Sequence, residues 1–347
     1  MLRKRDLVSI TVMAAIVAVT LWMVLGDGRW AQVWSAMKLA GWSWLVLGAL
    51  LMVAYTATEA LVIRTCLKAM GHRPRYRHCC EFAAAGFYFS SVTPSATGGQ
   101  PAEVFYMTRR GISAAHGALA MLLFTIFHQV ASVVYGLAAW LMAPEVPASL
   151  GTGLGVLLGY GLTTLLLLTV GMVALLIYPK PVEHLCRWCL RLGAKLRLVK
   201  DLDRALAGLK GQMEEYARGA ALIKGQPLLP VKLLALAMLQ QGLRFLVPWA
   251  VYRALGLSAL GPTQLVATQA LVYLAVGCLP IPGAVGASEA AFLTAFQSQF
   301  GPALTPAAML LTRGLSFYLP LLVTGAVTAA VHVSTREKKK VPCPKIS

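Results

Sequence analysis

A run of 27 residues without a charged side chain extends from Thr152 to Tyr178 and reads TGLGVLLGYGLTTLLLLTVGMVALLIY. A helix needs about 20 predominantly apolar residues to cross the hydrocarbon core of a bilayer, so this run is long enough to span a membrane. The rest of the 347-residue chain is similar, since 58% of its residues are hydrophobic and 13% are charged. An average soluble domain has about 45–50% apolar and about 25% charged residues. The sequence therefore predicts a protein that crosses the bilayer several times.

Similar apolar runs recur along the chain and define the predicted fold class, an all-α polytopic membrane protein. Six runs are continuous and are predicted to be full transmembrane helices: 7–25, 42–63, 116–142, 152–178, 228–252 and 304–332. Two more apolar stretches, 79–107 and 264–300, are interrupted in the middle by Pro and Gly. Irregular backbone at membrane depth is tolerated only where protein or a water-filled cavity satisfies its polar groups. We therefore expect these two stretches to form re-entrant broken-helix hairpins.

Positive charge identifies the cytoplasmic face of the predicted fold. The chain carries 31 Lys and Arg against 13 Asp and Glu, which gives a formal net charge of +18. If both interrupted stretches return to the side that they leave, 25 of the Lys and Arg lie on one face, ten of them in 179–227. The positive-inside rule assigns this face, with both termini, to the cytoplasm. The segment 179–227 is then expected to form amphipathic helices against anionic lipid, and no direct nucleic-acid partner is expected.

The same topology makes the two halves of the chain an inverted repeat. Pro94 precedes Glu103 by nine residues, Pro280 precedes Glu289 by nine residues, and corresponding positions lie 186 residues apart. Inverted repeats with discontinuous helices are typical of secondary transporters, whose substrate site lies where the breaks meet. Two unrelated kinks are the alternative. The predicted units are a first repeat, a second repeat and a basic tail, at 1–150, 151–335 and 336–347.

Charged residues inside the apolar stretches are the main candidates for a substrate site, because ionisable groups at membrane depth are expensive and by default functional. Glu103 and Glu289 follow the two interruptions, and Arg244 and Arg313 lie inside continuous spans. A guanidinium matches a phosphate in two parallel hydrogen bonds, and a carboxylate suits a cationic headgroup. The alternatives are structural: the glutamates cap helix N-termini, or they form buried ion pairs with the arginines.

Uncharged residues complete the predicted substrate-binding set. These are Gly98, Gly99, Gln100 and Gln241. His128 is a candidate proton-linked residue, and a hydrogen-bonded core histidine is the alternative. We expect no catalytic residue and no cofactor. We also expect no metal site, because Cys186 and Cys189 have no second pair that would complete a zinc site. A phosphate-binding loop of the ATPase type is also absent from the sequence.

Small residues at a four-residue spacing begin the fourth predicted span. Gly151, Gly155 and Gly159 form two consecutive steps of this kind. Such steps allow helix backbones to approach one another in membranes. They predict close packing of this span against another helix.

Two motifs carry a resemblance to a known family. They read SVTPSATGGQPAE at Ser91–Glu103 and LPIPGAVGASEA at Leu279–Ala290. They resemble the two signature motifs of the lysylphosphatidylglycerol synthase transmembrane (flippase-like) family, over roughly residues 5–335. The resemblance implies a bacterial inner-membrane protein. In the best-known members a cytoplasmic domain transfers lysine from aminoacyl-tRNA to phosphatidylglycerol, and the membrane domain moves the product lipid to the outer leaflet, which gives resistance to cationic peptides.

The sequence departs from that pattern after His332, because the 15 residues Val333–Ser347 do not form a synthase domain. Transferase activity is therefore not expected of this chain alone. We expect a lipid translocase that moves an aminoacylated or other phospholipid, such as lysyl-phosphatidylglycerol, between leaflets. The alternatives are a membrane subunit of a phosphatidylglycerol lysyltransferase system with a separate catalytic chain, and a non-transporting scaffold. The expected partners are an anionic or aminoacylated phospholipid and a separate synthase subunit, and a homo-oligomer is left open.

Overall fold

The computed structural model describes residues 30–93, 96–145, 151–178, 183–184, 187–188, 191, 202–279 and 281–337. Within these residues the secondary structure is helical, and it includes no strand. The predicted span 7–25 and most of the predicted basic tail lie outside the described residues, as do Pro94 and Pro280. The all-helical fold class is confirmed for the described part of the chain.

The helices follow one another with short connections. The α-helices are α2 (Trp30–Leu39), α3 (Trp42–Ala69), α4 (Tyr76–Val92), α5 (Gly99–Arg109), α6 (Ala114–Met142), α8 (Gly151–Ile177), α10 (Leu202–Lys224), α11 (Leu229–Phe245), α12 (Val247–Ala254), α13 (Pro262–Val276), α14 (Ala287–Ala295), α15 (Gln297–Arg313) and α16 (Leu319–Glu337). A 3₁₀ turn, η2 (Pro282–Ala284), precedes α14, and a π-helix, η3 (Gly314–Tyr318), joins α15 to α16.

Five helices of the described chain are long and apolar enough to cross a membrane. They are Trp42–Ala69, Ala114–Met142, Gly151–Ile177, Leu229–Ala254 and Gln297–His332. Each overlaps one of the continuous spans expected from the sequence, and the remaining predicted span lies in the part of the chain that is not described. The protein is therefore a multi-pass membrane protein, and the sixth crossing stays a prediction.

Both interrupted stretches form a helix, a break and a second helix. In the first, α4 and α5 run antiparallel, because Gly99 packs against Ser90 and Gly86, and Gly86 lies against Glu103. In the second, α13 ends at Val276, and the chain turns through η2 before α14 begins. Gly286, directly before α14, has a φ of 85°, a conformation that L side chains rarely adopt. Broken helices are confirmed at both places, and their re-entry from one membrane face stays a prediction.

The order of the elements matches between the two halves of the chain. Helices α4 and α13 begin at Tyr76 and Pro262, which are 262 minus 76, or 186, residues apart. This is the same offset that separates the two glutamates of the sequence motifs. In each half a long helix precedes the broken stretch and another long helix follows it. This order agrees with an internal repeat, whose inverted orientation in a membrane stays a prediction.

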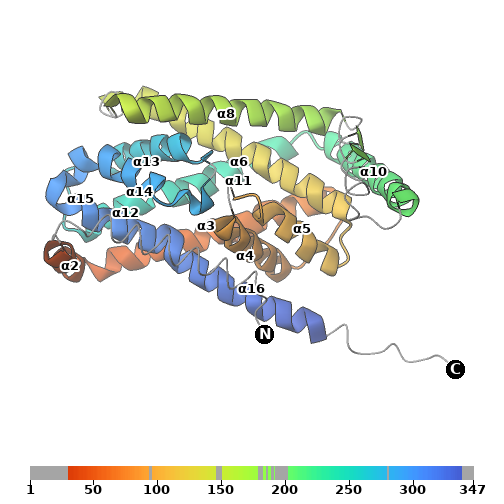
Figure 1. Ribbon diagram of the computed structural model, residues 1–347, viewed down its shortest axis with the longest axis horizontal. Coiled ribbons are helices and arrows are strands. Elements are labelled where there is room, and N and C mark those ends of the chain that lie inside the picture. Colours follow the sequence, from red (N-terminus) through yellow and green to blue (C-terminus); the bar gives the residue numbers. More distant parts are fainter. Residues whose placement is uncertain are drawn as a thin grey trace.

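The long helices pack into one bundle. Helix α3 lies against α11 and α4, and α6 lies against α13 and α11. Figure 1 shows α8 along one long edge of the bundle and α16 along the opposite edge. One hydrophobic core includes Leu271, Phe292 and Phe296 around the second broken stretch, and another includes Ile63 and Met107 around the first. Each broken stretch therefore has its own core.

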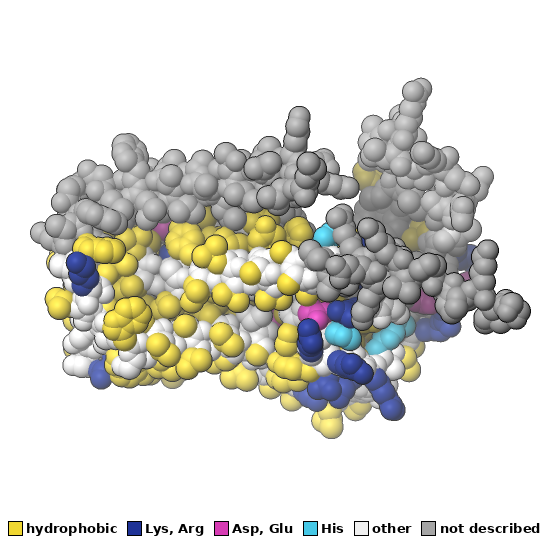
Figure 2. Space-filling view, turned by 90° about the horizontal axis from the view of Figure 1, so that it is seen from below, with side chains coloured by type: hydrophobic (Ala, Val, Ile, Leu, Met, Phe, Trp, Pro, Cys, Tyr) yellow, Lys and Arg dark blue, Asp and Glu magenta, His cyan; other side chains and the backbone are white. Residues whose placement is uncertain are grey.

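The outer surface has the polarity of a membrane protein. Large apolar side chains are exposed along the long helices, including Leu50 and Val53 on α3 and Leu167 and Val170 on α8. Figure 2 shows hydrophobic side chains spread along the described part of one face, with most of the Lys and Arg at one end together with His. This basic end is the predicted cytoplasmic end. Tryptophans mark the other end, where Arg253 stacks on Trp44.

Helix α10 is the best-described part of the predicted basic segment 179–227. Its inner face packs on α6, and Tyr216 is buried and donates a hydrogen bond to the carbonyl of Leu175 at 3.2 Å. Its outer face carries exposed Lys210 and Arg218. One amphipathic helix of this segment is therefore confirmed.

The predicted glycine steps of the fourth span make no close packing with the described residues. A methyl group built on Gly151, Gly155 or Gly159 would meet no atom of the described part of the chain within 4 Å. The close approach is made instead by Gly161, where a methyl group would overlap the carbonyl oxygen of Leu274 on α13. The regular spacing faces outward because the helix turns its other side toward the bundle.

Candidate functional site

The second broken stretch holds its glutamate in an ion pair. Glu289, on α14, lies 2.7 Å from the Nε of Arg313 at the end of α15. The Oε2 of Glu289 also accepts a hydrogen bond from the backbone N–H of Gly286 at 2.6 Å, and Arg313 donates another to the carbonyl of Gly283 at 3.2 Å. Glu289 therefore caps α14 and pairs with Arg313, so both structural alternatives are confirmed at this position.

The first broken stretch holds its glutamate differently. Glu103, on α5, is 3% exposed and forms no ion pair among the described residues. Its carboxyl lies against Gly86 and faces the carboxyl of Glu59 on α3, and its Oε2 is buried without a hydrogen-bond partner. The helix-cap alternative is not found at Glu103, because α5 begins at Gly99, two residues before Pro101, and Thr93 Oγ1 accepts the hydrogen bond from the N–H of Gly98 at 2.9 Å.

Arg244 lies near Glu59 of this carboxyl pair and forms no ion pair among the described residues. It sits on α11 with its guanidinium 4.9 Å from the ring centre of Tyr273 and 6.0 Å from that of Tyr55. No ion pair within 4 Å involves Arg244 in the described chain, so the predicted pairing with a glutamate is absent there. Its charge nevertheless acts on Glu59, which lies one turn beyond Tyr55 on α3.

The two predicted arginines have separate surroundings. Arg313 stacks on Phe317, with 4.5 Å between the guanidinium and the ring centre, and bonds to the second broken stretch. Arg244 stacks between aromatic rings of α3 and α13. A shared grip on one phosphate is not formed in this structure and stays a prediction.

Neighbouring polar side chains connect the helices around Arg244. Gln240 is fully buried and donates a hydrogen bond to Glu59 at 3.2 Å. Gln241, also fully buried, donates to Ser132 Oγ on α6 at 2.6 Å. His128 Nε2 lies 3.2 Å from the hydroxyl of Tyr273, as the core-histidine alternative expects, and its proton-linked role stays a prediction.

The remaining predicted residues lie at the break of the first hairpin. Gly98 is the residue before α5, and Gly99 has no room for a side chain against Ser90 and the carbonyl of Gly86. Gln100 is exposed and donates a hydrogen bond to Thr125 Oγ1 at 2.5 Å. These residues shape the break, and any contact with a substrate stays a prediction.

Glu59 and the aromatic residues around Arg244 are not in the substrate-binding set predicted from the sequence. Glu59 lies well inside an apolar span, where a charge is a functional signal, but basic 64–78 is close in sequence and offered it another partner. The structure buries Glu59 and turns it inward, away from those residues. Tyr55 lies four residues before Glu59, so the spacing alone places the two side chains on the same face of the helix.

The described residues contain no group of His, Cys, Asp and Glu that could hold a metal ion. Cys66, Cys79, Cys80 and Cys278 are free thiols, and Cys186 and Cys189 lie outside the described residues.

Comparison with known proteins agrees with this architecture. Residues 8–324 match the family described as the lysylphosphatidylglycerol synthase TM region. A UPF0104 membrane protein of Archaeoglobus fulgidus is 32% identical over 89 residues, which is 26% of this chain and 27% of that protein. The match thus spans about a quarter of the relative. Because the family match covers most of the chain, this multi-pass membrane protein belongs to the lysylphosphatidylglycerol synthase TM region family.

Proposed function

We propose that the chain is a lipid translocase in which Arg244 holds the phosphate of a phospholipid during its passage between leaflets. The observation that carries the proposal is a half-buried guanidinium without an ion pair among the described residues, on a helix that is long and apolar enough to cross a membrane. An arginine at this depth is expensive to keep, and a phosphate matches its planar fork of donors.

The carboxyl pair beside Arg244 suits the other end of a zwitterionic or aminoacylated headgroup. Glu59 and Glu103 face each other without a cation within ion-pair distance in the described structure. A lysyl or alanyl ammonium would supply the missing positive charge, and the lipid tails would stay among the apolar side chains outside. The proposed substrate is therefore an aminoacylated or other phospholipid, of which lysyl-phosphatidylglycerol is one example.

In this proposal the second broken stretch is a latch. Its Glu289 is already held by Arg313 and by backbone, so it has no free charge to offer a ligand. The latch fixes α14 against α15 while the first broken stretch binds the headgroup.

The test is a leaflet-exposure assay with the full chain in vesicles that contain fluorescent phosphatidylglycerol or its lysyl ester. Arg244→Gln is expected to slow transfer about 30-fold, because losing the hydrogen bonds that a charged group makes to the phosphate costs about 2 kcal/mol. The matched control is Arg253→Gln, since Arg253 stacks on Trp44 at the other end of the bundle. Equal transfer by wild type and Arg244→Gln would refute the assignment of Arg244.

A second candidate function follows from the name of the matched family. A membrane subunit for a separate lysyltransferase chain would need lipid binding without transfer. In the same assay, wild-type protein that binds lysyl-phosphatidylglycerol but moves none would favour this candidate. Wild-type protein that neither binds nor moves lipid would favour a scaffold.

A further inference from the structure

The corner between α3 and α4 contains a basic pocket that the proposed function does not use. It is lined by Arg64, Lys68, Gly71, His72, Arg73 and Pro74, is open to the surface and has a volume of about 520 Å³. It lies at the basic end of the molecule, where Lys and Arg gather in Figure 2. Its volume falls within the range of about 300–1,000 Å³ that is usual for pockets that hold small ligands.

The cations of this pocket have no acidic partner in the described structure. Among the described ion pairs, none involves Arg64, Lys68 or Arg73. The nearby Glu81 is taken by Arg110 at 2.5 Å and by Arg77 at 3.6 Å. Three positive charges therefore face one cavity without neutralisation.

Arg64 gives an independent sign of a missing ligand. Its Nε is buried and has no hydrogen-bond partner in the described structure. Buried polar groups are nearly always hydrogen-bonded, so an orphaned donor on a cation calls for an acceptor. Lys68 in the last turn of α3 would be explained by the helix dipole alone, but the orphaned Nε of Arg64, one turn earlier, would not.

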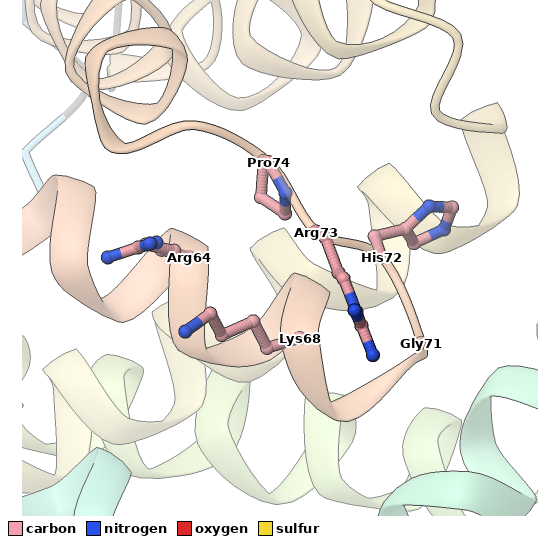
Figure 3. Close-up of a pocket in the computed structure, with 6 residues that line it drawn as sticks. All are labelled: Arg64, Lys68, Gly71, His72, Arg73 and Pro74. Carbon is pink, nitrogen blue, oxygen red and sulfur yellow. The ribbon is translucent and has the colours of Figure 1, made fainter.

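The side chains of Arg64 and Lys68 point in a different direction from that of His72. Figure 3 shows Arg64 and Lys68 extending in the same direction from successive turns of α3, whereas the His72 ring points away from them. His72 Nε2 lies 2.9 Å from His116 Nδ1 on α6. The histidine thus anchors the loop, and the two α3 cations remain available for a ligand.

An apolar stripe leads along α3 to these cations. Val46, Leu50, Val53 and Leu61 are exposed and are followed on the same helix face by Arg64 and Lys68, at spacings of three, four or, over two turns, eight residues. Tyr76 is also exposed and lies beside the stripe, because its hydroxyl donates a hydrogen bond to the carbonyl of Ala57 at 2.7 Å. A stripe that suits an acyl chain thus ends in a pocket that suits a phosphate.

We propose that this pocket binds the phosphate of an anionic phospholipid, with one acyl chain along the exposed face of α3. The shared chemistry is a phosphate in a cationic pocket, and the apolar stripe assigns it to a lipid and not to a soluble phosphate compound. Such binding takes place at the basic end and requires no transfer between leaflets, so it is independent of the proposed function.

The experiment measures binding of pyrene-labelled phosphatidylglycerol to the full chain in phosphatidylcholine nanodiscs. The pocket variant Arg64→Gln/Lys68→Gln is expected to bind phosphatidylglycerol about 30-fold more weakly, since each basic side chain near an anionic lipid surface contributes about a factor of five. The matched control is Arg77→Gln/Lys210→Gln, which removes the same charge from exposed residues of the same end that do not line the pocket. The control is expected to stay within about twofold of wild type.

A second pair of measurements separates a lipid from a soluble phosphate. Leu61→Ser shortens the stripe and is expected to weaken phosphatidylglycerol binding severalfold, and glycerol phosphate is expected not to compete. Effective competition by glycerol phosphate, with no effect of Leu61→Ser, would overturn the lipid assignment. Equal losses in the pocket and control variants, or no loss in either, would overturn the site itself. Failure of the proposed function is read separately, from transfer by Arg244→Gln.

Discussion

In the second broken stretch the carboxyl of Glu289 is held by Arg313 and by the N–H of Gly286, whereas in the first the carboxyl of Glu103 lies against Gly86 and faces Glu59. The two glutamates occupy the same place in their motifs, nine residues after a proline. The difference lies in the helices that pack on each hairpin, because α15 presents a cation and α3 presents another acid.

A repeated motif can thus repeat a shape without repeating its chemistry. Proline and glycine break the helix in both places, whatever surrounds them. The charge balance is set by residues more than twenty positions away, which the motif does not contain. The glutamate of the second hairpin has a cationic partner in the described structure and that of the first does not, which is why the proposed substrate site lies at the first.

The largest expected effect comes from removing the cation that pairs with Glu289 in the second broken stretch. Arg313→Leu leaves Glu289 buried without its partner and is expected to lower the free energy of unfolding by about 3–5 kcal/mol. Chemical unfolding in detergent measures this. The double variant Arg313→Leu/Glu289→Leu is expected to recover most of the loss, and a double variant as unstable as the single one would show that the ion pair is not the cause.

Packing against the second hairpin gives the next largest effect. Gly161→Ala places a methyl group on the carbonyl of Leu274 and is expected to destabilise the protein by about 1–3 kcal/mol. Gly159→Ala, two residues away on the open side of α8, is the control and is expected to be neutral or slightly stabilising, because alanine is the better helix former. Thermal unfolding of both variants under one detergent condition decides this, and equal midpoints would contradict the packing.

The first broken stretch is expected to tolerate the loss of the carboxylate charge of Glu103. Glu103→Gln keeps the size of the side chain and is expected to change the free energy of unfolding by less than about 1 kcal/mol, because no ion pair is lost. Glu289→Gln, at the corresponding position, loses hydrogen bonds to a charged group and is expected to cost about 1.5–3 kcal/mol. If the two variants were equally stable, the contrast between the hairpins would be lost.

The smallest effect is a pH dependence at the base of the first hairpin. Burial and the neighbouring His116 lower the pKa of His72 below its usual value of about 6.5, and Glu215 partly offsets this. A lowered pKa means that the stability contributed by neutral His72 is fully present above about pH 6.5 and is lost as the pH falls through the folded pKa.

The measurement is the melting temperature between neutral and mildly acidic pH. His72→Gln is expected to flatten the part of the profile just below pH 6.5. The stretch between Leu255 and Thr305, which contains the second hairpin, has no histidine, so an unchanged profile in His72→Gln would remove this difference between the hairpins.

Much of the fold could be predicted from the sequence, because apolar run length and Pro/Gly breaks act locally. Five long apolar helices and both breaks are found where those patterns put them. The ion pair of Arg313 with Glu289 could also be predicted, since few charged residues exist in the apolar stretches. The surroundings of Arg244 could not be predicted, because Tyr55 and Tyr273 reach it from distant helices and an aromatic ring in an apolar run carries no distinguishing signal.

The π-helix at Gly314–Tyr318 ties the two hairpins to one length of chain. It begins directly after Arg313, which bonds to the second hairpin, and ends before α16, which packs on α4 of the first. Phe317, within it, packs in one cluster with Val285 and Phe87 from the two hairpins. A π turn holds one residue more than an α turn, so it offsets the face of α16 from that of α15 by about 100°. Deleting a single residue here would rotate the face of α16 that contacts the first hairpin relative to the face of α15 that contacts the second. The length of this turn therefore fixes the orientation of both contacts.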